Sequence, residues 1–249
     1  MLYFQIHLVF ILNDCIRYGH WKCADDDRKR LKGKIQKTVV LRHGRKSKKL
    51  NSNIKIVFWS GGKDSFLTFN KIAEDSCKTI FLTTFNPETG VVPEQDIQFD
   101  YIIHQAKALK VDLVAVPLPL DCPNDIYIST IEDALNLICE TFNTQDITLC
   151  FGDLHLEEIR KWRESCFSKY KCEFPLFNAN YEDLVRTLNS LPAEVVFSKI
   201  NYISEDSRIE VGKPFNIETF LHLHNNTKID AFGENGEFHT WVKLKEKGI

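Results

Sequence analysis

The feature that most constrains this chain is a short apolar run, residues 54–59 (IKIVFW), which breaks into a glycine-rich turn, residues 60–65 (SGGKDS). The run has the length of a buried strand, and two glycines let the backbone turn tightly and approach a ligand closely. Asp64 or Ser65 can cap a helix over residues 66–72, whose positive dipole end would face the turn. The pattern predicts a strand, an anion-binding turn and a helix. The plainer alternative is an ordinary tight turn between a strand and a helix.

The turn does not match a Walker loop. Lys63 is followed by Asp64 instead of Ser or Thr, and no glycine stands five residues before Gly62. It resembles instead the pyrophosphate loop of the ATP pyrophosphatases, which cleave ATP between the α and β phosphates.

The chain has an ordinary globular composition but an uneven charge. It has 249 residues, of which 43% are hydrophobic and 27% charged. Residues 1–50 carry 13 Lys and Arg against 4 Asp, and residues 28–49 hold eleven of these basic residues with no acidic one. We predict a disordered basic extension over residues 1–50. Such an arm could tether nucleic acid, but a solvated tail is the favoured interpretation, so no nucleic-acid partner is expected.

Cysteine usage and hydropathy bear on the compartment. The eight cysteines are scattered, with no C-x-x-C motif and no paired metal spacing. Such thiols are typical of a reducing compartment, so we expect a cytoplasmic protein. No uninterrupted run of about 18–20 apolar residues occurs, and we expect no membrane partner.

Apolar runs and helical stripes alternate after residue 53. Strands are predicted at residues 79–85, 111–116 and 147–151, and helices over residues 95–110 and 123–140. The alternation indicates an α/β fold, with a mostly parallel sheet and helices on both faces, in an ATP-binding domain over residues 51–173. Ligands of such sheets collect at the carboxyl ends of strands. Thr83, Thr84 and Phe85 are therefore expected beside the adenine and ribose, unless they merely finish their strand.

Asp153 follows the predicted strand at residues 147–151 and lies in the sequence GDLHLEEIRKWRE, residues 152–164. A carboxylate there could hold Mg²⁺ bound to ATP phosphates, or grip a substrate amine. The alternative is that Asp153 caps the next helix. In that helix, Leu156, Ile159 and Trp162 are predicted to face the core.

The carboxyl-terminal part, residues 174–249, is predicted to be a smaller α+β lobe, with helices over residues 181–190 and 217–224 and a strand over residues 193–201. Its sharpest feature is DAFGENGEFHT, residues 230–240. Carboxylates, an amide and an imidazole spaced by glycines suit a loop that folds over a polar ligand. Asn235-Gly236 is also a strong hairpin signal, and a hairpin tip could present both glutamates. His239 could be a base or a satisfied polar group.

Four segments together, SGGKDS, GDLHLEEIRKWRE, FPLF at residues 174–177 and DAFGENGEFHT, resemble the diphthine–ammonia ligase family of pyrophosphate-loop enzymes. The likeness includes bacterial relatives known only as ATP-binding or adenine nucleotide alpha hydrolase-like proteins, and runs from about residue 54 to residue 242. It implies a HUP-type α/β nucleotide domain and a smaller lobe that closes over the substrate. The sequence GENGEFHT, with Asn235 between the two glutamates, is closer to that of bacterial members. The acceptor substrate could therefore differ from diphthine.

The resemblance implies that ATP adenylates the carboxylate of diphthine on elongation factor 2, and that ammonia from ammonium then displaces AMP to give diphthamide. Lys63, Asp64 and Asp153 would be catalytic, with Mg²⁺ at Asp153. The nucleotide site would comprise Ser60, Gly61, Gly62, Lys63, Asp64 and Ser65, to which we add Thr84. The substrate site would comprise Gly233, Glu234, Asn235, Gly236, Glu237 and His239. Adenylation of another small molecule or of a tRNA base, and nucleotide binding without turnover, are the alternatives.

Overall fold

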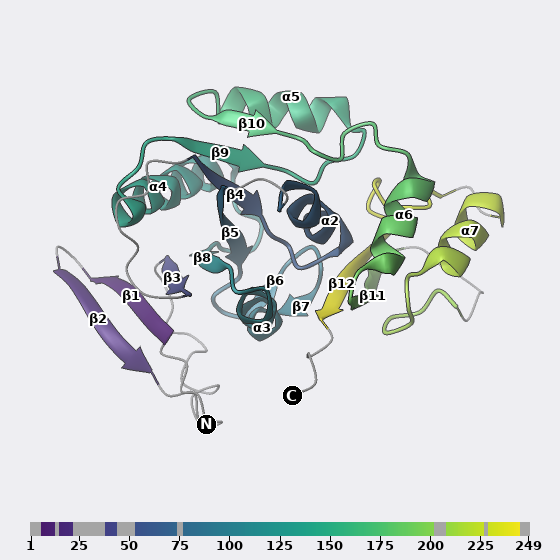
Figure 1. Ribbon diagram of the computed structural model, residues 1–249, viewed down its shortest axis with the longest axis horizontal. Coiled ribbons are helices and arrows are strands. Elements are labelled where there is room, and N and C mark those ends of the chain that lie inside the picture. Colours follow the sequence, from purple (N-terminus) through teal and green to yellow (C-terminus); the bar gives the residue numbers. More distant parts are fainter. Residues whose placement is uncertain are drawn as a thin grey trace. The chain divides into compact units, whose positions relative to one another are not determined.

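A computed structural model describes residues 6–12, 15–21, 38–43, 53–73, 77–201, 208–226 and 229–244, the first two ranges as backbone only. The bounds of the elements follow in chain order, with the labels of Figure 1. The strands are β1 Ile6–Leu12, β2 Cys15–Trp21, β3 Val39–Arg42, β4 Ile54–Phe58, β5 Lys78–Phe85, β6 Val91–Val92, β7 Ile97–Gln98, β8 Asp112–Pro117, β9 Ile147–Cys150, β10 Lys171–Glu173, β11 Ala193–Ile200 and β12 Phe238–Leu244. The helices are α2 Lys63–Ile72, α3 Phe99–Leu109, α4 Asn124–Phe142, α5 Glu157–Cys166, α6 Tyr181–Ser190 and α7 Ile217–Asn226.

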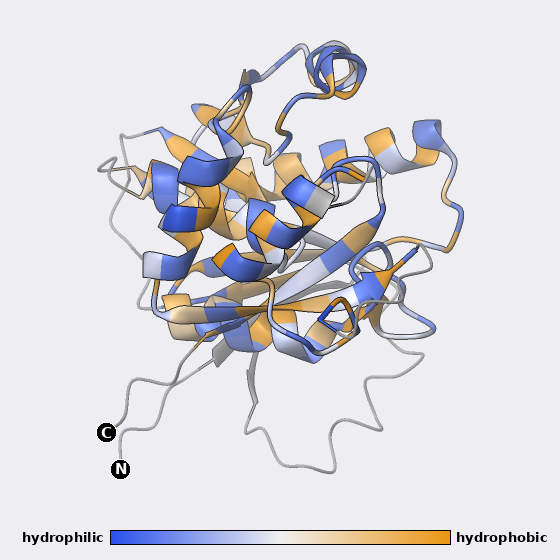
Figure 2. Ribbon diagram, turned by 90° about the vertical axis from the view of Figure 1, so that its right-hand side faces the viewer, coloured by the Kyte–Doolittle hydropathy of each residue, from blue (hydrophilic) through white to orange (hydrophobic). Residues whose placement is uncertain are grey.

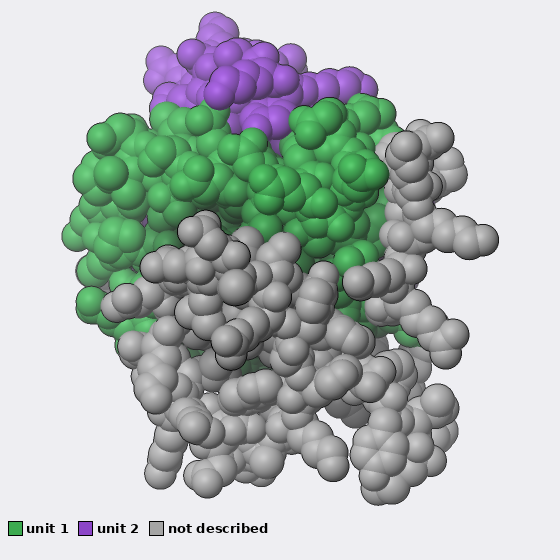
Figure 3. Space-filling model, turned by 90° about the vertical axis from the view of Figure 1, so that its left-hand side faces the viewer, with its two compact units in different colours: residues 1–56, 77–93, 98–148 green, residues 57–76, 94–97, 149–249 purple. Residues whose placement is uncertain are grey.

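The chain divides into two compact units, which Figure 3 distinguishes by colour. Unit 1 comprises residues 1–56, 77–93 and 98–148, and unit 2 comprises residues 57–76, 94–97 and 149–249. The division falls within β4 and β9, so the turn at residues 60–65 groups with the carboxyl-terminal part of the chain. The domain boundary predicted between residues 173 and 174 remains a prediction.

Unit 1 contains the strands β5, β8, β3, β1 and β2, which are neighbours in that order in the central sheet. β5 and β8 are parallel, with Ile80 opposite Asp112 and Phe85 opposite Pro117. Both strands are apolar and buried along most of their length, as expected when a parallel sheet is covered on its two faces. α3 and α4 contact β8, and each buries the apolar residues of one side. Figure 2 shows hydrophilic and hydrophobic residues alternating along the helices that face the viewer. The predicted α/β fold with a mostly parallel sheet is confirmed.

The amino-terminal part of unit 1 differs from the predicted disordered extension wherever it is described. β3 pairs antiparallel with β8, β1 pairs antiparallel with β3, and β2 pairs antiparallel with β1. Val39, Val40 and Leu41 are buried, and their β-branched and apolar side chains suit a strand that is paired on both sides. The basic composition of the surrounding residues concealed this apolar segment. Most of the basic run, residues 22–37 and 44–52, lies outside the described residues.

Unit 2 is built around an antiparallel pair of strands and a group of phenylalanines. β11 pairs with β12 from Ala193 opposite Leu244 to Ile200 opposite Phe238. α6 contacts both β11 and α7 beside this pair (Figure 1). The rings of Phe197, Phe215, Phe220, Phe232 and Phe238 are buried and contact one another edge to face or tilted. Contacts between these separated segments give unit 2 a core of its own.

α5 corrects one prediction about unit 2. It buries none of its residues, and Ile159, predicted to face the core, is 40% exposed. The helix is held instead by guanidinium groups stacked on rings: Arg160 lies 4.7 Å from the Phe177 centroid, and Arg163 lies 4.6 Å from that of Phe151. The apolar period was real, but arginine–aromatic contacts decide how this helix packs.

Within the described residues, no helix has the length and apolar character needed to cross a membrane.

Candidate functional site

The predicted anion-binding turn begins α2 in unit 2. Gly62 is the N-cap, and no side chain makes a capping hydrogen bond there. Ser65 lies inside the helix, and its hydroxyl donates back to the Gly62 carbonyl at 3.0 Å. The predicted cap by Asp64 or Ser65 is therefore wrong, because the N-cap Gly62 lies two residues before Asp64 and three before Ser65. The amides of Asp64 and Ser65 fall in the first turn, where a helix has no carbonyl of its own for them.

The middle of β12 lies directly on this turn. The amide of Val242 donates to the Gly61 carbonyl at 2.9 Å, and the amide of Lys63 donates to Thr240 Oγ1 at 3.1 Å across 177 residues of sequence. A Cβ on Gly62 would lie 2.9 Å from the Thr240 carbonyl oxygen. Glycine is required at position 62 because the backbone of the turn approaches the backbone of β12 closely there. The two sequence signatures, residues 60–65 and 230–240, therefore adjoin within unit 2.

Lys63 is buried, with 3% of its surface exposed. Its Nζ lies 2.8 Å from Asp64 Oδ2, and it also lies 4.8 Å from the Phe232 ring centroid, 5.7 Å from that of Phe238 and 5.9 Å from that of Phe215. A buried ammonium is stabilised by such an ion pair and by the negative faces of aromatic rings. Lys63 is held in this cage here, so contact with a phosphate would require exchange of the Asp64 ion pair.

The acidic loop at residues 230–237 is shaped by its own carboxylates. Asp230 Oδ1 accepts from the amides of Phe232 at 2.8 Å and Glu234 at 3.2 Å. Glu237 Oε1 accepts from the Asp230 amide at 2.8 Å, and Oε2 accepts from the Asn235 amide at 3.1 Å. The amide of Gly233 returns to the Asp230 carbonyl at 3.0 Å. Glu237 and Asp230 therefore stabilise the loop directly.

The Asn235-Gly236 dipeptide forms a turn, but it is not the tip of a hairpin between consecutive strands. β12 begins two residues later and pairs with β11, which ends at Ile200. The Asn201 side chain donates to the Gly236 carbonyl at 2.8 Å and so ties the end of β11 to this turn. The hairpin alternative is wrong, because β12 pairs with β11, and a long connection separates these two strands in the sequence.

Glu234 is the carboxylate of this loop whose pKa is influenced by charges of the turn at residues 60–65. Its Oε2 accepts from the Leu154 amide at 3.3 Å, just after β9. Burial raises the pKa of Glu234 to about 7, and the charge of Asp64 adds to the rise. Lys63 and the Leu154 hydrogen bond lower it, while Asp153 raises it further. Glu234, Asp64 and Lys63 thus form one electrostatic group.

Asp153 is held by an arginine. Its Oδ2 accepts from Arg163 Nε at 2.7 Å and its Oδ1 from Nη2 at 3.1 Å, a bidentate ion pair. The predicted alternative of a helix cap is wrong, since Leu156 is the N-cap of α5. Over the described residues, no group of three or more His, Cys, Asp or Glu side chains is arranged to hold a metal ion. Asp64 Oδ1, in contrast, is buried without a hydrogen-bond partner among them.

Tyr181 is a site residue that the sequence analysis missed. Its hydroxyl donates to Asp230 Oδ2 at 3.0 Å and lies 2.9 Å from His155 Nδ1, and its ring stacks on Phe232 at 4.8 Å. Burial raises the pKa of Tyr181 above its ordinary value, and the Asp230 charge adds to the rise. No sequence motif identifies a lone tyrosine at the start of a helix. The signal that could have pointed to Tyr181 is its position just after the FPLF segment.

The two remaining predicted residues lie in different units. His239 is opposite Lys199 in the β11–β12 pair, and burial lowers its pKa while Glu94 opposes that change. Thr84 lies near the carboxyl end of β5 in unit 1, opposite Val116. Its neighbour Phe85 is buried and stacks on Phe99 at 4.4 Å, so Phe85 is a core residue. The nucleotide-binding role of Thr84 remains a prediction.

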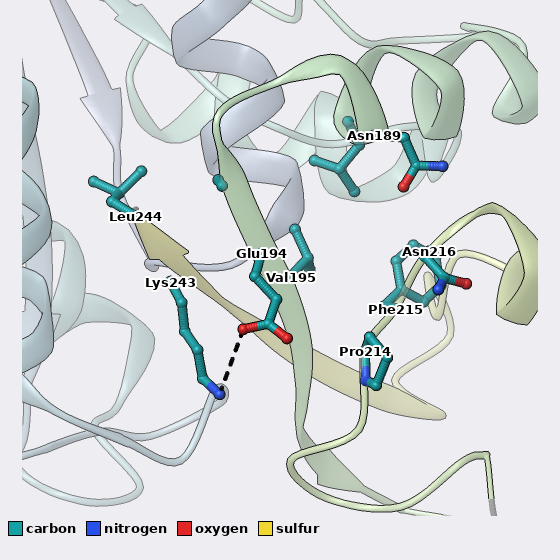
Figure 4. Close-up of a pocket in the computed structure, with 10 residues that line it drawn as sticks. Asn189, Glu194, Val195, Pro214, Phe215, Asn216, Lys243 and Leu244 are labelled. Carbon is teal, nitrogen blue, oxygen red and sulfur yellow. Dashed lines mark ion pairs between the residues drawn. The ribbon is translucent and has the colours of Figure 1, made fainter. Parts of the chain in front are cut away.

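A surface pocket of unit 2 lies apart from this group (Figure 4). It is lined by the start of β11, the end of β12 and the segment at residues 214–216, and Glu194 and Lys243 form an ion pair of 3.9 Å along it. It contains no residue of the turn at 60–65 or of the loop at 230–237. The pocket therefore adds nothing to the predicted site.

Sequence comparison does not place the chain, because no protein-family model and no curated protein matches it. A solved structure that matches is described as a predicted subunit of tRNA methyltransferase from Methanocaldococcus jannaschii. It is 16% identical, with a TM-score of 0.38, and the match covers 80% of this chain and 100% of that one. A likeness this weak carries no argument about function, which rests on the geometry of unit 2.

Proposed function

We propose that unit 2 binds ATP at residues 60–65 and transfers AMP to a carboxylate presented at the loop of residues 230–240. The observation that carries this proposal is the direct hydrogen bond from the Lys63 amide to Thr240, which joins the start of α2 to the second signature. In the specific form implied by the sequence resemblance, the carboxylate is that of diphthine on elongation factor 2. Ammonia, from ammonium, then displaces AMP and forms the amide.

The residues of the turn suit an anionic ligand. The amides of the first turn of α2 and its dipole would face the phosphates of ATP. Lys63 would add a positive charge after exchanging its ion pair with Asp64, whose Oδ2 it now contacts at 2.8 Å. Charge that develops on the leaving pyrophosphate would be stabilised by these fixed donors.

Mg²⁺ fits this site as a companion of ATP. Asp64 Oδ1, buried and without a hydrogen-bond partner in the described structure, is the oxygen best suited to hold it. Asp153 would contribute only after releasing Arg163. Mg²⁺ bound to ATP would neutralise charge on the phosphates and on the leaving group.

Glu234 would serve the acceptor side of the reaction. A carboxyl group with a pKa of about 7 can hold a cation when ionised, or exchange a proton near neutral pH. Either property suits an ammonium ion or the cationic imidazole of diphthine. Glu237 and Asn235 are less suited to contact a substrate, because they already hydrogen-bond to each other and Glu237 also accepts from the Asp230 amide.

The test is a turnover assay with the full chain, ATP, Mg²⁺, ammonium and elongation factor 2 that carries diphthine. We expect equal release of AMP and pyrophosphate, which requires both the acceptor and ammonium. Release of AMP with another carboxylate or a tRNA, but not with diphthine, would replace the acceptor and keep the chemistry. Tight ATP binding by calorimetry, with no pyrophosphate from any acceptor, would contradict the enzyme proposal.

Binding without turnover is the second candidate, and the state of Lys63 favours it. The ammonium is neutralised by Asp64 and enclosed by three rings. A nucleotide that did not displace Asp64 could bind through the backbone amides alone. Asp64→Asn distinguishes the two candidates, since it should leave such binding intact but abolish release of pyrophosphate if Asp64 holds Mg²⁺ in the reaction.

A further inference from the structure

The segment that follows β9 is connected to the acidic loop of unit 2 at two consecutive residues, directly at Leu154 and through Tyr181 at His155. Leu154 donates its amide to Glu234 Oε2 at 3.3 Å, and its carbonyl accepts from the Asn178 amide at 2.6 Å. The next residue, His155, reaches Asp230 through the Tyr181 hydroxyl. Leu154 is 1% exposed, so the segment that carries His155 is anchored in the core of unit 2.

Proton counting fixes the direction of the hydrogen bonds in this chain of side chains. The Tyr181 hydroxyl has one hydrogen, and an ionised carboxylate can only accept, so the hydrogen lies toward Asp230 Oδ2 at 3.0 Å. The 2.9 Å contact with His155 Nδ1 then requires that His155 donates. Neutral His155 must therefore carry its proton on Nδ1, because the hydrogen bond selects the tautomer.

The other end of the chain of hydrogen bonds sets the backbone that carries Glu234. Asp230 Oδ1 accepts from the amides of Phe232 and Glu234, while Oδ2 is the atom that Tyr181 holds. Rotation of the Asp230 carboxylate would move both oxygens together and break the two hydrogen bonds that the amides of Phe232 and Glu234 donate to Oδ1. The orientation of Asp230 therefore couples His155, which is exposed, to the backbone at Glu234.

We infer that His155, as its Nδ1–H tautomer, and Tyr181 are positioning residues that orient Asp230 and thereby direct Glu234 toward the turn at residues 60–65. Its catalytic consequence rests on the proposed function. The order of the loop and the tautomer of His155 do not, and they can be measured on the protein without any substrate.

The structural test is nuclear magnetic resonance on the full chain at a pH where His155 is neutral. We expect the ¹⁵N shifts of the wild-type His155 ring to report a protonated Nδ1. In Tyr181→Phe the hydroxyl is lost, while the ring that stacks on Phe232 is kept. The tautomer equilibrium of the His155 ring should therefore shift toward the Nε2–H form. The amides of Phe232 and Glu234 should also exchange with solvent at least tenfold faster. An Nε2–H tautomer in the wild type, or unchanged amide exchange in Tyr181→Phe, would overturn the inference.

The functional test compares His155→Ala with His155→Asn, whose side-chain N–H₂ can donate from nearly the same place as Nδ1. We expect His155→Ala to lower kcat or raise the KM for diphthine-bearing elongation factor 2 by tenfold or more, with the Kd for ATP unchanged. His155→Asn should recover most of this loss, and His104→Ala, at an exposed histidine of α3, should match the wild type. Equal defects in the Ala and Asn variants, or a changed ATP Kd, would exclude a positioning role. If the wild type turns over no acceptor, the proposed function fails, while the resonance experiment still decides the inference.

Discussion

The turn at residues 60–65 and the loop at residues 230–237 adjoin in unit 2, yet they are shaped by different groups. The turn takes its form from backbone: Gly61 and Gly62 lie against β12, and the start of α2 has no side-chain cap. The loop takes its form from side chains, since Asp230 and Glu237 bind its amides. The turn leaves Asp64 Oδ1 without a hydrogen-bond partner in the described structure, whereas in the loop two of the three carboxylates are structural. Glu234 is the exception.

The sharpest way to test the loop is to compare its two glycines. Gly233 has φ +75°, and an added Cβ would lie 2.8 Å from the Phe238 carbonyl oxygen and 3.1 Å from its ring. Gly233→Ala should lower the free energy of unfolding by about 3 kcal/mol, from backbone strain and overpacking together. Gly236→Ala is the matched control, because Gly236 has φ +82° with nothing within 4 Å. It should cost only about 1 kcal/mol. Equal losses in urea denaturation would show that the contact with Phe238 does not shape the loop.

A lysine exchange tests whether the turn serves a ligand. Lys63→Ala should weaken ATP binding by about 10- to 100-fold, which is about 1.4–2.8 kcal/mol, because it removes the buried cation beside the amides proposed to bind the phosphates. Lys71→Ala, at the exposed end of the same helix, is the control and should bind as the wild type does. Calorimetric titration with ATP and Mg²⁺ measures both. Unchanged affinity in a folded Lys63→Ala protein would remove this side chain from the nucleotide site.

The two glutamates of the loop should respond differently to the same substitution. Glu237→Gln places an N–H₂ group against an amide that now donates to a carboxylate oxygen, so we expect a loss of about 1–2 kcal/mol in the free energy of unfolding. Chemical denaturation at neutral pH measures the loss. Glu234→Gln, measured in parallel, should not be destabilised, since its amide oxygen can still accept from Leu154. A larger loss at Glu234 than at Glu237 would reverse the assignment of structural and ligand-facing carboxylates.

The smallest expected effect is the pH dependence that Glu234 imposes. Its pKa is raised from 4.5 to about 7 in the folded protein, so the folded state keeps a proton that the unfolded state releases. The resulting stability is fully present below pH 4.5 and is lost as the pH rises through 7. Relative to the wild type, Glu234→Gln should therefore become more stable as the pH rises across this window, with a Tm a few degrees higher at pH 8. Thermal unfolding from pH 4 to 8 measures the gain, with the exposed Glu88→Gln as control. A constant difference between variant and wild type would contradict the raised pKa.

The predicted secondary structure held where local periodicity controls it. The strands β4, β5, β8, β9 and β11 and the helices α3, α4, α6 and α7 lie at or near the predicted residues. The misses came from context. β3 was hidden by a basic composition, β12 was read as a polar signature, and α5 is held by arginines on rings instead of by its apolar stripe.

The sequence by itself determined the strand, turn and helix at residues 54–72, because an apolar run, two glycines and a helical stripe are local signals. It also identified a polar loop within residues 230–240, which in the structure ends at Glu237, where β12 follows. Only the tertiary structure decided that Thr240 binds the Lys63 amide, that Lys63 is enclosed by phenylalanines, and that His155, Tyr181 and Asp230 join. These contacts link residues that are 26 to 177 positions apart in the chain. No periodicity records them, because they follow from how the strands and helices of unit 2 pack around a shared core.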